Sequence, residues 1–140
     1  MRALIAAVAV LAFTLSSAEP RSNASGVRPS VAFLVTGGAW QTKTEHGRYR
    51  VVVEDGGWEH VTSHVFVEWL VEDGNKRRIV VGAAALISEL GDKWSVGQPK
   101  VTPSKMGATV ELPAANAFEP DKPMRKFFVE LGAPGQYQVK

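Results

Sequence analysis

The sequence predicts an all-β protein: an antiparallel β-sandwich of seven or eight strands with a broadly immunoglobulin-like architecture. After residue 30 the apolar residues are mostly valines and aromatics in short runs, and Gly, Asp, Asn and Pro separate the runs. Valine and aromatic side chains favour strands, and the separating residues favour turns. One face of the predicted strands is almost wholly apolar and needs a second layer to cover it. A small β-barrel is the alternative architecture.

The first 18 residues have the composition of a secretory signal peptide. Arg2 supplies a positive charge, residues 3–15 are uncharged and largely apolar, and residues 16–18 are small. This apolar run is shorter than the roughly 20 residues of a membrane-spanning helix. We therefore expect cleavage near Ala18 and a periplasmic or secreted protein.

Residues 19–29 contain two prolines among small and polar residues, and predict a flexible leader. Residues 30–140 then have a length that suits a single β-sandwich domain.

Eight strands are predicted from the apolar runs and the turn residues between them. They lie near Val31–Thr36, Arg48–Glu54, Glu59–Glu72, Lys76–Leu90, Trp94–Val101, Ala108–Leu112, Lys126–Leu131 and Tyr137–Val139. A two-turn helix over residues 83–90, ended by Gly91, is the alternative for the end of the fourth strand. Residues 113–123 are rich in Pro and Ala and predict a loop.

Two turns, at residues 55–57 and 73–75, allow a register to be proposed. If both are three-residue loops, Glu54 faces Trp58 and Glu72 faces Lys76. One face of three consecutive strands is then apolar and is predicted to form the core. Its members are Tyr49, Val51, Val53, Val61, Val65, Val67, Trp69, Val71, Ile79 and Val81.

The opposite face of these strands mixes charged and apolar residues, and it is the main candidate for a binding surface. Its candidate binding residues are Arg48, Arg50, His64, Phe66, Glu68 and Arg78. Arginine and aromatic residues together are typical of protein interfaces. The alternative is that the C-terminal strands or the 113–123 loop cover Phe66 and Leu70, leaving an ordinary solvated rim.

Composition excludes several classes of function. The chain has 16 Lys and Arg against 14 Asp and Glu, a net charge of +2, with both signs interspersed. This balance gives no electrostatic reason to expect nucleic acid or an anionic membrane surface as partner. The chain has no cysteine, which excludes disulfides, thiolate metal sites and a cysteine nucleophile.

The three histidines, His46, His60 and His64, are the residues on which an enzyme or a metal-binding protein would depend. On a strand, His60 and His64 are separated by about 13 Å, too far to share one ion. Ser63 and His64 are adjacent and point to opposite faces, which removes the simplest nucleophile and base pair. No catalytic residue, metal site or cofactor is predicted.

Four tryptophans provide a weaker binding hypothesis. Trp69 belongs to the predicted core face, whereas Trp40, Trp58 and Trp94 flank loops. Aromatic side chains at loops stack on sugar rings in many carbohydrate-binding modules, or else close the ends of the sandwich. Carbohydrate binding through these three residues is thus one alternative, and a small periplasmic enzyme or metal-binding protein is the other. The primary prediction is an exported, non-enzymatic binding module whose partner is a protein or small ligand of the cell envelope.

Overall fold

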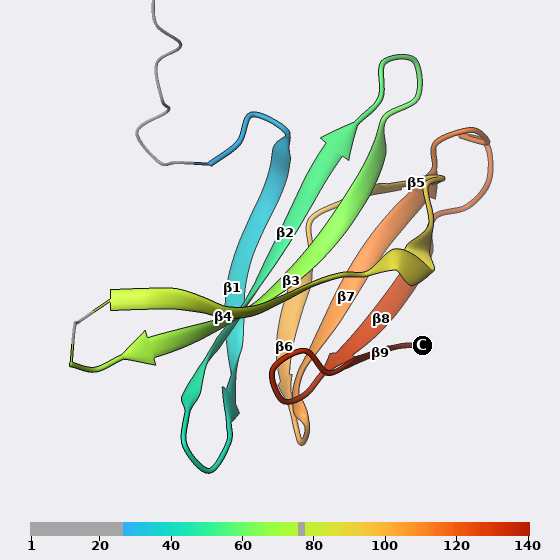
Figure 1. Ribbon diagram of the computed structural model, residues 1–140. Helices are drawn as coiled ribbons and strands as arrows, with labels where there is room; N and C mark the ends of the chain where they lie inside the picture. Colours follow the sequence, from blue (N-terminus) through green and yellow to red (C-terminus); the bar gives the residue numbers. More distant parts are fainter. Residues whose placement is uncertain (1–26, 76–77) are drawn as a thin grey trace, which may run out of the picture.

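The computed structural model describes residues 27–75 and 78–140, which form two antiparallel sheets packed face to face (Figure 1). The predicted signal peptide, residues 1–18, and residues 19–26 of the predicted leader lie outside the described residues. In Figure 1 the strands β1–β4 form the left layer and β6–β9 the right layer.

The first layer, sheet A, is a meander with the strand order β1-β2-β3-β4. Its strands are β1 (Val31–Gln41), β2 (His46–Gly56), β3 (Thr62–Asp73) and β4 (Arg78–Leu86). A single 3-10 turn, η1 (Ser88–Leu90), leads to the second layer, sheet B. The strands of sheet B are β5 (Trp94–Val96), β6 (Lys100–Ser104), β7 (Gly107–Asn116), β8 (Arg125–Leu131) and β9 (Tyr137–Val139). Their order is β5-β7-β8-β9, and β6 also pairs with β7.

The predicted β-sandwich is confirmed, and the sheets do not close into the alternative barrel. The connectivity is simpler than that of an immunoglobulin domain, in which strands cross between the sheets in Greek keys. Here the first four strands make one sheet, the last five make the other, and the chain crosses once between them over the described residues.

Several element boundaries differ from the prediction, and β1 runs on to Gln41 instead of ending at Thr36. The strand predicted over Trp94–Val101 is divided into β5 and β6, and the amide of Gly97 between them donates to the Pro113 carbonyl at 2.8 Å. Strand β7 runs on to Asn116, so the loop predicted over 113–123 begins later. The helical alternative for 83–90 is limited to the turn η1.

The core lies between the inner faces of the two sheets. The largest fully buried side chains are Trp69, Tyr49, Leu112, Leu131, Val51, Val53, Val65, Val67, Val110 and Val129. They alternate with less buried residues along β2, β3, β7 and β8, as expected for strands covered on one side. The predicted core positions of β2 and β3 are therefore confirmed, except for Val61, which precedes β3 and is exposed.

The β2–β3 hairpin has a longer loop than predicted. Gly56 pairs with Thr62, and Val51 pairs with Val67 instead of Val61. The register therefore differs by six residues from the predicted one. Because this shift is even, every side chain of β2 keeps the face assigned to it.

The β3–β4 hairpin contradicts the assignment of Ile79 and Val81 to the core. Leu70 pairs with Val81, but its neighbour Trp69 pairs with Ala83. Gly82 is therefore an extra, unpaired residue in β4, which makes a β-bulge. Ile79 and Val81 are consequently turned to the outer face and are exposed. Ala83 and Ala85 occupy the core side instead, packed partly against the core.

Candidate functional site

Five of the six predicted binding residues lie together on one surface, the outer face of sheet A. Arg48 and Arg50 on β2 and His64, Phe66 and Glu68 on β3 alternate with core residues, so they point away from sheet B. The sixth, Arg78, begins β4 opposite Asp73, and its side chain is not among the described parts of the chain.

A row of four apolar residues crosses all four strands of this outer face. Leu34 of β1 pairs with Val52, Val52 with Phe66, and Phe66 with Leu86 of β4. The ends of the row are open, since Leu34 is 45% exposed and Leu86 is 42% exposed. Strands β7 and β8 pack on the opposite, inner face. The apolar row therefore has no covering layer among residues 27–75 and 78–140.

Two ion pairs run beside the apolar row. Arg50 and Glu68 are register partners, and the Arg50 Nε donates to a Glu68 carboxylate oxygen. Arg48 Nε lies 3.2 Å from Glu72 Oε1. The outer face therefore combines an apolar row with charges that are already neutralised in pairs.

The serine and histidine residues do not form a catalytic pair. Ser63 is buried, donates to Asp55 Oδ1 at 2.6 Å and accepts from the Val96 amide at 2.8 Å. It thereby joins the two sheets. His64 points to the outer face, where Nε2 lies 3.7 Å from Asp92 Oδ1.

The other two histidines occupy separate places. His46 begins β2, and His60 lies in the β2–β3 loop with Nδ1 3.1 Å from the Ala117 carbonyl oxygen. In the described part of the chain, no three His, Cys, Asp or Glu side chains come together closely enough to hold a metal ion.

The tryptophans predicted to flank loops have two different environments. Trp40 and Trp94 are only 4% and 6% exposed, and thus pack at the ends of the sandwich. Trp40 Nε1 donates to the Arg48 carbonyl at 3.2 Å. Trp58, by contrast, is 97% exposed in the β2–β3 loop. Of the three, Trp58 alone presents its ring to solvent.

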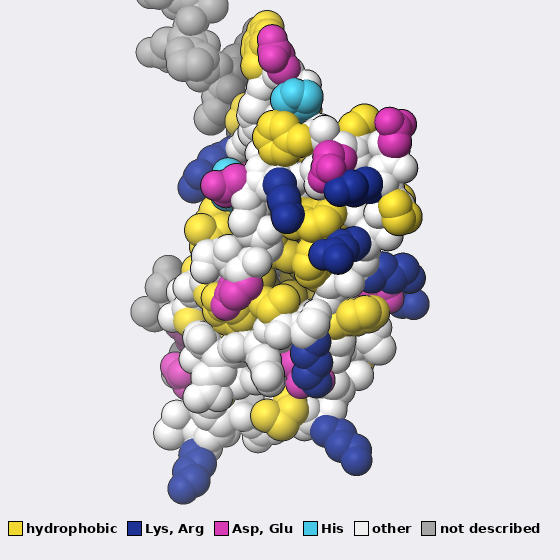
Figure 2. All heavy atoms as spheres, turned by 90° about the vertical axis from the view of Figure 1, so that its right-hand side faces the viewer, with side chains coloured by type: hydrophobic (Ala, Val, Ile, Leu, Met, Phe, Trp, Pro, Cys, Tyr) yellow, Lys and Arg dark blue, Asp and Glu magenta, His cyan; other side chains and the backbone are white. Residues whose placement is uncertain are grey.

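A second surface, which sequence reasoning did not single out, lies at the end of the sandwich formed by the β7–β8 loop and β5. In Figure 2 dark-blue Lys and Arg side chains gather in the upper half of one side of the molecule, around hydrophobic atoms. Lys93, Lys122 and Arg125 line a hollow of about 340 Å³ at this end of the sandwich. Lys93 is distant in sequence from Lys122 and Arg125, so no local motif reveals the proximity of the three cations.

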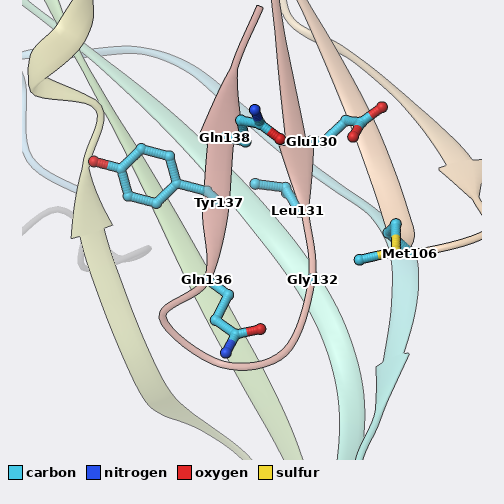
Figure 3. A pocket seen from close by; sticks show the side chains of 7 residues that line it. All are labelled: Met106, Glu130, Leu131, Gly132, Gln136, Tyr137 and Gln138. Atoms are coloured by element: carbon cyan, nitrogen blue, oxygen red, sulfur yellow. The ribbon is translucent and has the colours of Figure 1, made fainter.

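A further hollow, of about 160 Å³, lies beside the β8–β9 turn (Figure 3). Glu130, one of its lining residues, is paired with Lys140 Nζ at 2.6 Å. Tyr137 reaches toward the chain after β4, with its hydroxyl 3.1 Å from Glu89 Oε2. Burial and the bond to Glu89 raise the pKa of Tyr137. This hollow is smaller than the roughly 300 Å³ at which small-molecule sites begin.

The fold and the surfaces described define a β-sandwich with one open sheet face and a basic hollow at one end. Comparison with protein-family models, with curated proteins and with solved structures found no match for this chain. The described residues include no helix with the length and apolar character needed to cross a membrane.

Proposed function

We propose that this chain is an exported, non-enzymatic binding module that takes a protein partner on the outer face of sheet A. The observation that carries this proposal is the apolar row Leu34, Val52, Phe66 and Leu86, whose two ends are exposed and over which no second layer lies among residues 27–75 and 78–140. A sheet face of this kind gains free energy when a partner removes it from water.

The charges beside the row favour a protein partner over a small ligand. The surface is a sheet face, and the hollow at the Leu86 end of the row, of about 270 Å³, is smaller than the roughly 300 Å³ at which small-molecule sites begin. Protein interfaces instead bury about 800 Å² on each partner. Arginine and aromatic residues are enriched in such interfaces. Arg50 lies diagonally across from Phe66 on the neighbouring strand, and Arg48 lies further along β2, opposite Leu70. The ion pairs of the two arginines would set the orientation of the partner.

The contacts of Ser63 support binding over catalysis. Its hydroxyl joins Asp55 to the Val96 amide inside the protein. It is therefore committed to a structural role, and it lies on the opposite side of the sheet from His64.

The experiment is cross-linking and affinity capture of the tagged protein expressed with its own N-terminal segment in its native host, followed by mass spectrometry. The test variants are Phe66→Lys and the charge exchange Arg50→Glu with Glu68→Arg. The exchange keeps the two charges opposite each other, so folding is retained while the charge pattern seen by a partner is reversed. Phe128→Lys is the matched control, since Phe128 is exposed on β8 of the other sheet.

We expect a reproducible envelope or extracellular protein that the wild type and the Phe128 variant capture and that both outer-face variants lose. Capture that survives both outer-face variants would reject this surface as the binding site. Absence of any specific partner would reject a protein ligand.

Export has a separate test that does not depend on the partner. The signal-peptide prediction expects the mature protein to begin at Glu19. Mass spectrometry of protein recovered from the periplasm or medium checks this. An intact N-terminus at Met1, with the protein retained in the cytoplasm, would contradict export and leave the surface proposal to be judged by its own experiment.

A further inference from the structure

The hollow at the end of the sandwich is built from β5, the end of β7 and the β7–β8 loop. Its lining residues are Lys93, Trp94, Asn116, Glu119, Lys122, Pro123, Met124 and Arg125. Its volume of about 340 Å³ falls within the range of small-molecule sites. Figure 2 shows this side of the molecule, with Lys and Arg side chains around hydrophobic atoms.

Asn116 fixes the shape of the loop that bounds the hollow. Its side-chain oxygen accepts from the Phe118 amide at 3.0 Å, and its side-chain nitrogen donates to Glu119 Oε2 at 2.8 Å. The loop is also held to the β2–β3 loop, because His60 Nδ1 lies 3.1 Å from the Ala117 carbonyl oxygen and the His60 ring lies 4.8 Å from that of Phe118. The hollow is therefore preorganised by contacts of its own walls.

The charges of the hollow do not balance. Glu119 is its single carboxylate, and it lies 2.6 Å from Lys122 Nζ. The bond to Lys122, together with the charges of Lys122 and Lys93, lowers the pKa of Glu119. Lys93 and Arg125 pair with no carboxylate among residues 27–75 and 78–140. Two positive charges thus remain uncompensated.

These two cations are held in place by Trp94. Lys93 Nζ lies 5.3 Å from the centre of a Trp94 ring, and the Arg125 guanidinium carbon lies 5.8 Å from it. An indole ring attracts a cation more weakly than a carboxylate does, so the cations keep their capacity to bind an anion. Trp94 is almost fully buried, so its ring has a fixed position behind the two exposed cations.

Apolar side chains flank the positive charges. Met124 lines the hollow and is exposed, and Phe118 is exposed on the same loop. A ligand that places an anionic group near Lys93 and Arg125 can therefore rest an apolar part against Met124.

We propose that this hollow binds a small organic anion, a carboxylate or phosphate carried on an apolar or aromatic body. The anionic group lies between Lys93, Lys122 and Arg125, and the apolar part contacts Met124. This site is independent of the outer face of sheet A and of the protein partner proposed for it.

The test is a titration with phenyl phosphate at low ionic strength. Binding is monitored by calorimetry and by the indole N–H signals in NMR spectra. Trp94→Phe identifies the Trp94 signal. The site variant is Lys93→Gln with Arg125→Gln. The matched control is Lys43→Gln with Lys105→Gln, which removes the same charge from two exposed lysines at the β1–β2 and β6–β7 loops, the opposite end of the sandwich.

We expect saturable binding of phenyl phosphate that moves the Trp94 signal most, at least tenfold weaker binding by the site variant, and unchanged binding by the control variant. Benzoate is expected to bind as well, and added salt is expected to weaken the binding of both phenyl phosphate and benzoate. Binding lost equally in the site and control variants would overturn the proposal, because it would report net charge alone. The proposal would also be overturned if neutral benzyl alcohol or inorganic phosphate bound with the same affinity as phenyl phosphate. It would be overturned as well if phenyl phosphate produced no saturable change at millimolar concentrations.

Discussion

Tyr49 and Trp69, register partners on β2 and β3, both donate a hydrogen bond to the carbonyl oxygen of Gly132. The donor–acceptor distances are 2.9 Å from the Tyr49 hydroxyl and 3.0 Å from the Trp69 Nε1, and the two rings meet edge to face with centres 6.1 Å apart. Gly132 follows β8. One backbone carbonyl of the second layer thus satisfies two buried donors of the first, as buried polar groups require.

Replacing Tyr49 with Phe changes how stability depends on alkaline pH. Burial raises the pKa of Tyr49 from 10.0 to about 12. The folded protein therefore keeps the phenol proton between pH 10 and 12, whereas the unfolded chain releases it. The stabilisation from this group is complete below pH 10 and is lost as pH rises toward 12, an effect on the order of 2 kcal/mol.

Urea unfolding of wild type and Tyr49→Phe between pH 8 and 11.5 measures this effect. At pH 8 we expect the variant to be less stable by about 1 kcal/mol, the net value of one hydrogen bond. The difference in stability between wild type and variant shrinks above pH 10, because the wild type loses stability when its phenol ionises and the variant has no phenol. A constant difference in unfolding free energy between the two proteins from pH 8 to 11.5 would contradict the raised pKa of Tyr49.

Two serines with buried hydroxyl groups have different expected effects when changed to alanine. Ser63→Ala removes the acceptor of the Val96 amide and the donor to Asp55, and should cost about 1–3 kcal/mol. Ser104 Oγ is buried with no hydrogen-bond partner in the described structure, so Ser104→Ala should be neutral or stabilising. Thermal unfolding of both variants tests the contrast, and an equal loss of stability in the two variants would contradict it.

Two glycines on β2 differ only in the space around them. A Cβ at Gly47 would overlap the backbone carbonyl oxygen of Leu70, whereas a Cβ at Gly56 would meet no heavy atom within 4 Å. Gly47→Ala forces β2 and β3 apart and should cost more than about 2 kcal/mol, while Gly56→Ala should be neutral or slightly stabilising. Chemical denaturation of the pair gives the comparison. Similar stability of the two variants would mean that β2 and β3 separate at Gly47 without loss.

Tryptophan quenching should single out Trp58. Trp40, Trp69 and Trp94 are buried, and Trp58 is 97% exposed. We expect acrylamide to quench one component of the wild-type emission, and Trp58→Phe to abolish that component while changing stability by less than about 0.5 kcal/mol. A quenchable component that persists in the variant would show that another tryptophan is accessible.

The faces of β2 and β3 could be predicted because alternation along a strand depends only on parity. Val51 and Trp69 are buried as expected, although the predicted register differs by six residues. The loop length could not be predicted, since Gly56 and Gly57 allow a turn at several positions and no local pattern selects the one that pairs Gly56 with Thr62.

The outer face of β4 and the basic hollow could not be predicted, for two different physical reasons. An extra residue at Gly82 reverses the facing of Ile79 and Val81. Every residue from 79 to 87 except Gly82 is apolar, so this strand has no alternation that could reveal the reversal. The hollow joins Lys93 to Lys122 and Arg125 only because β5 pairs with the end of β7. Contacts of this kind depend on strand pairing and leave no periodic pattern in the chain.

The single crossing from β4 to β5 sets the order in which a growing chain can fold. Sheet A is complete in sequence at Leu86, and its hairpins need only local contacts to form. The strands that cover its inner face, β7 and β8, end at Asn116 and Leu131, and the carbonyl that Tyr49 and Trp69 require comes at Gly132. During synthesis the chain therefore passes through lengths at which a finished sheet has a bare hydrophobic side, and it is at those lengths that chaperones are most needed and aggregation most favoured.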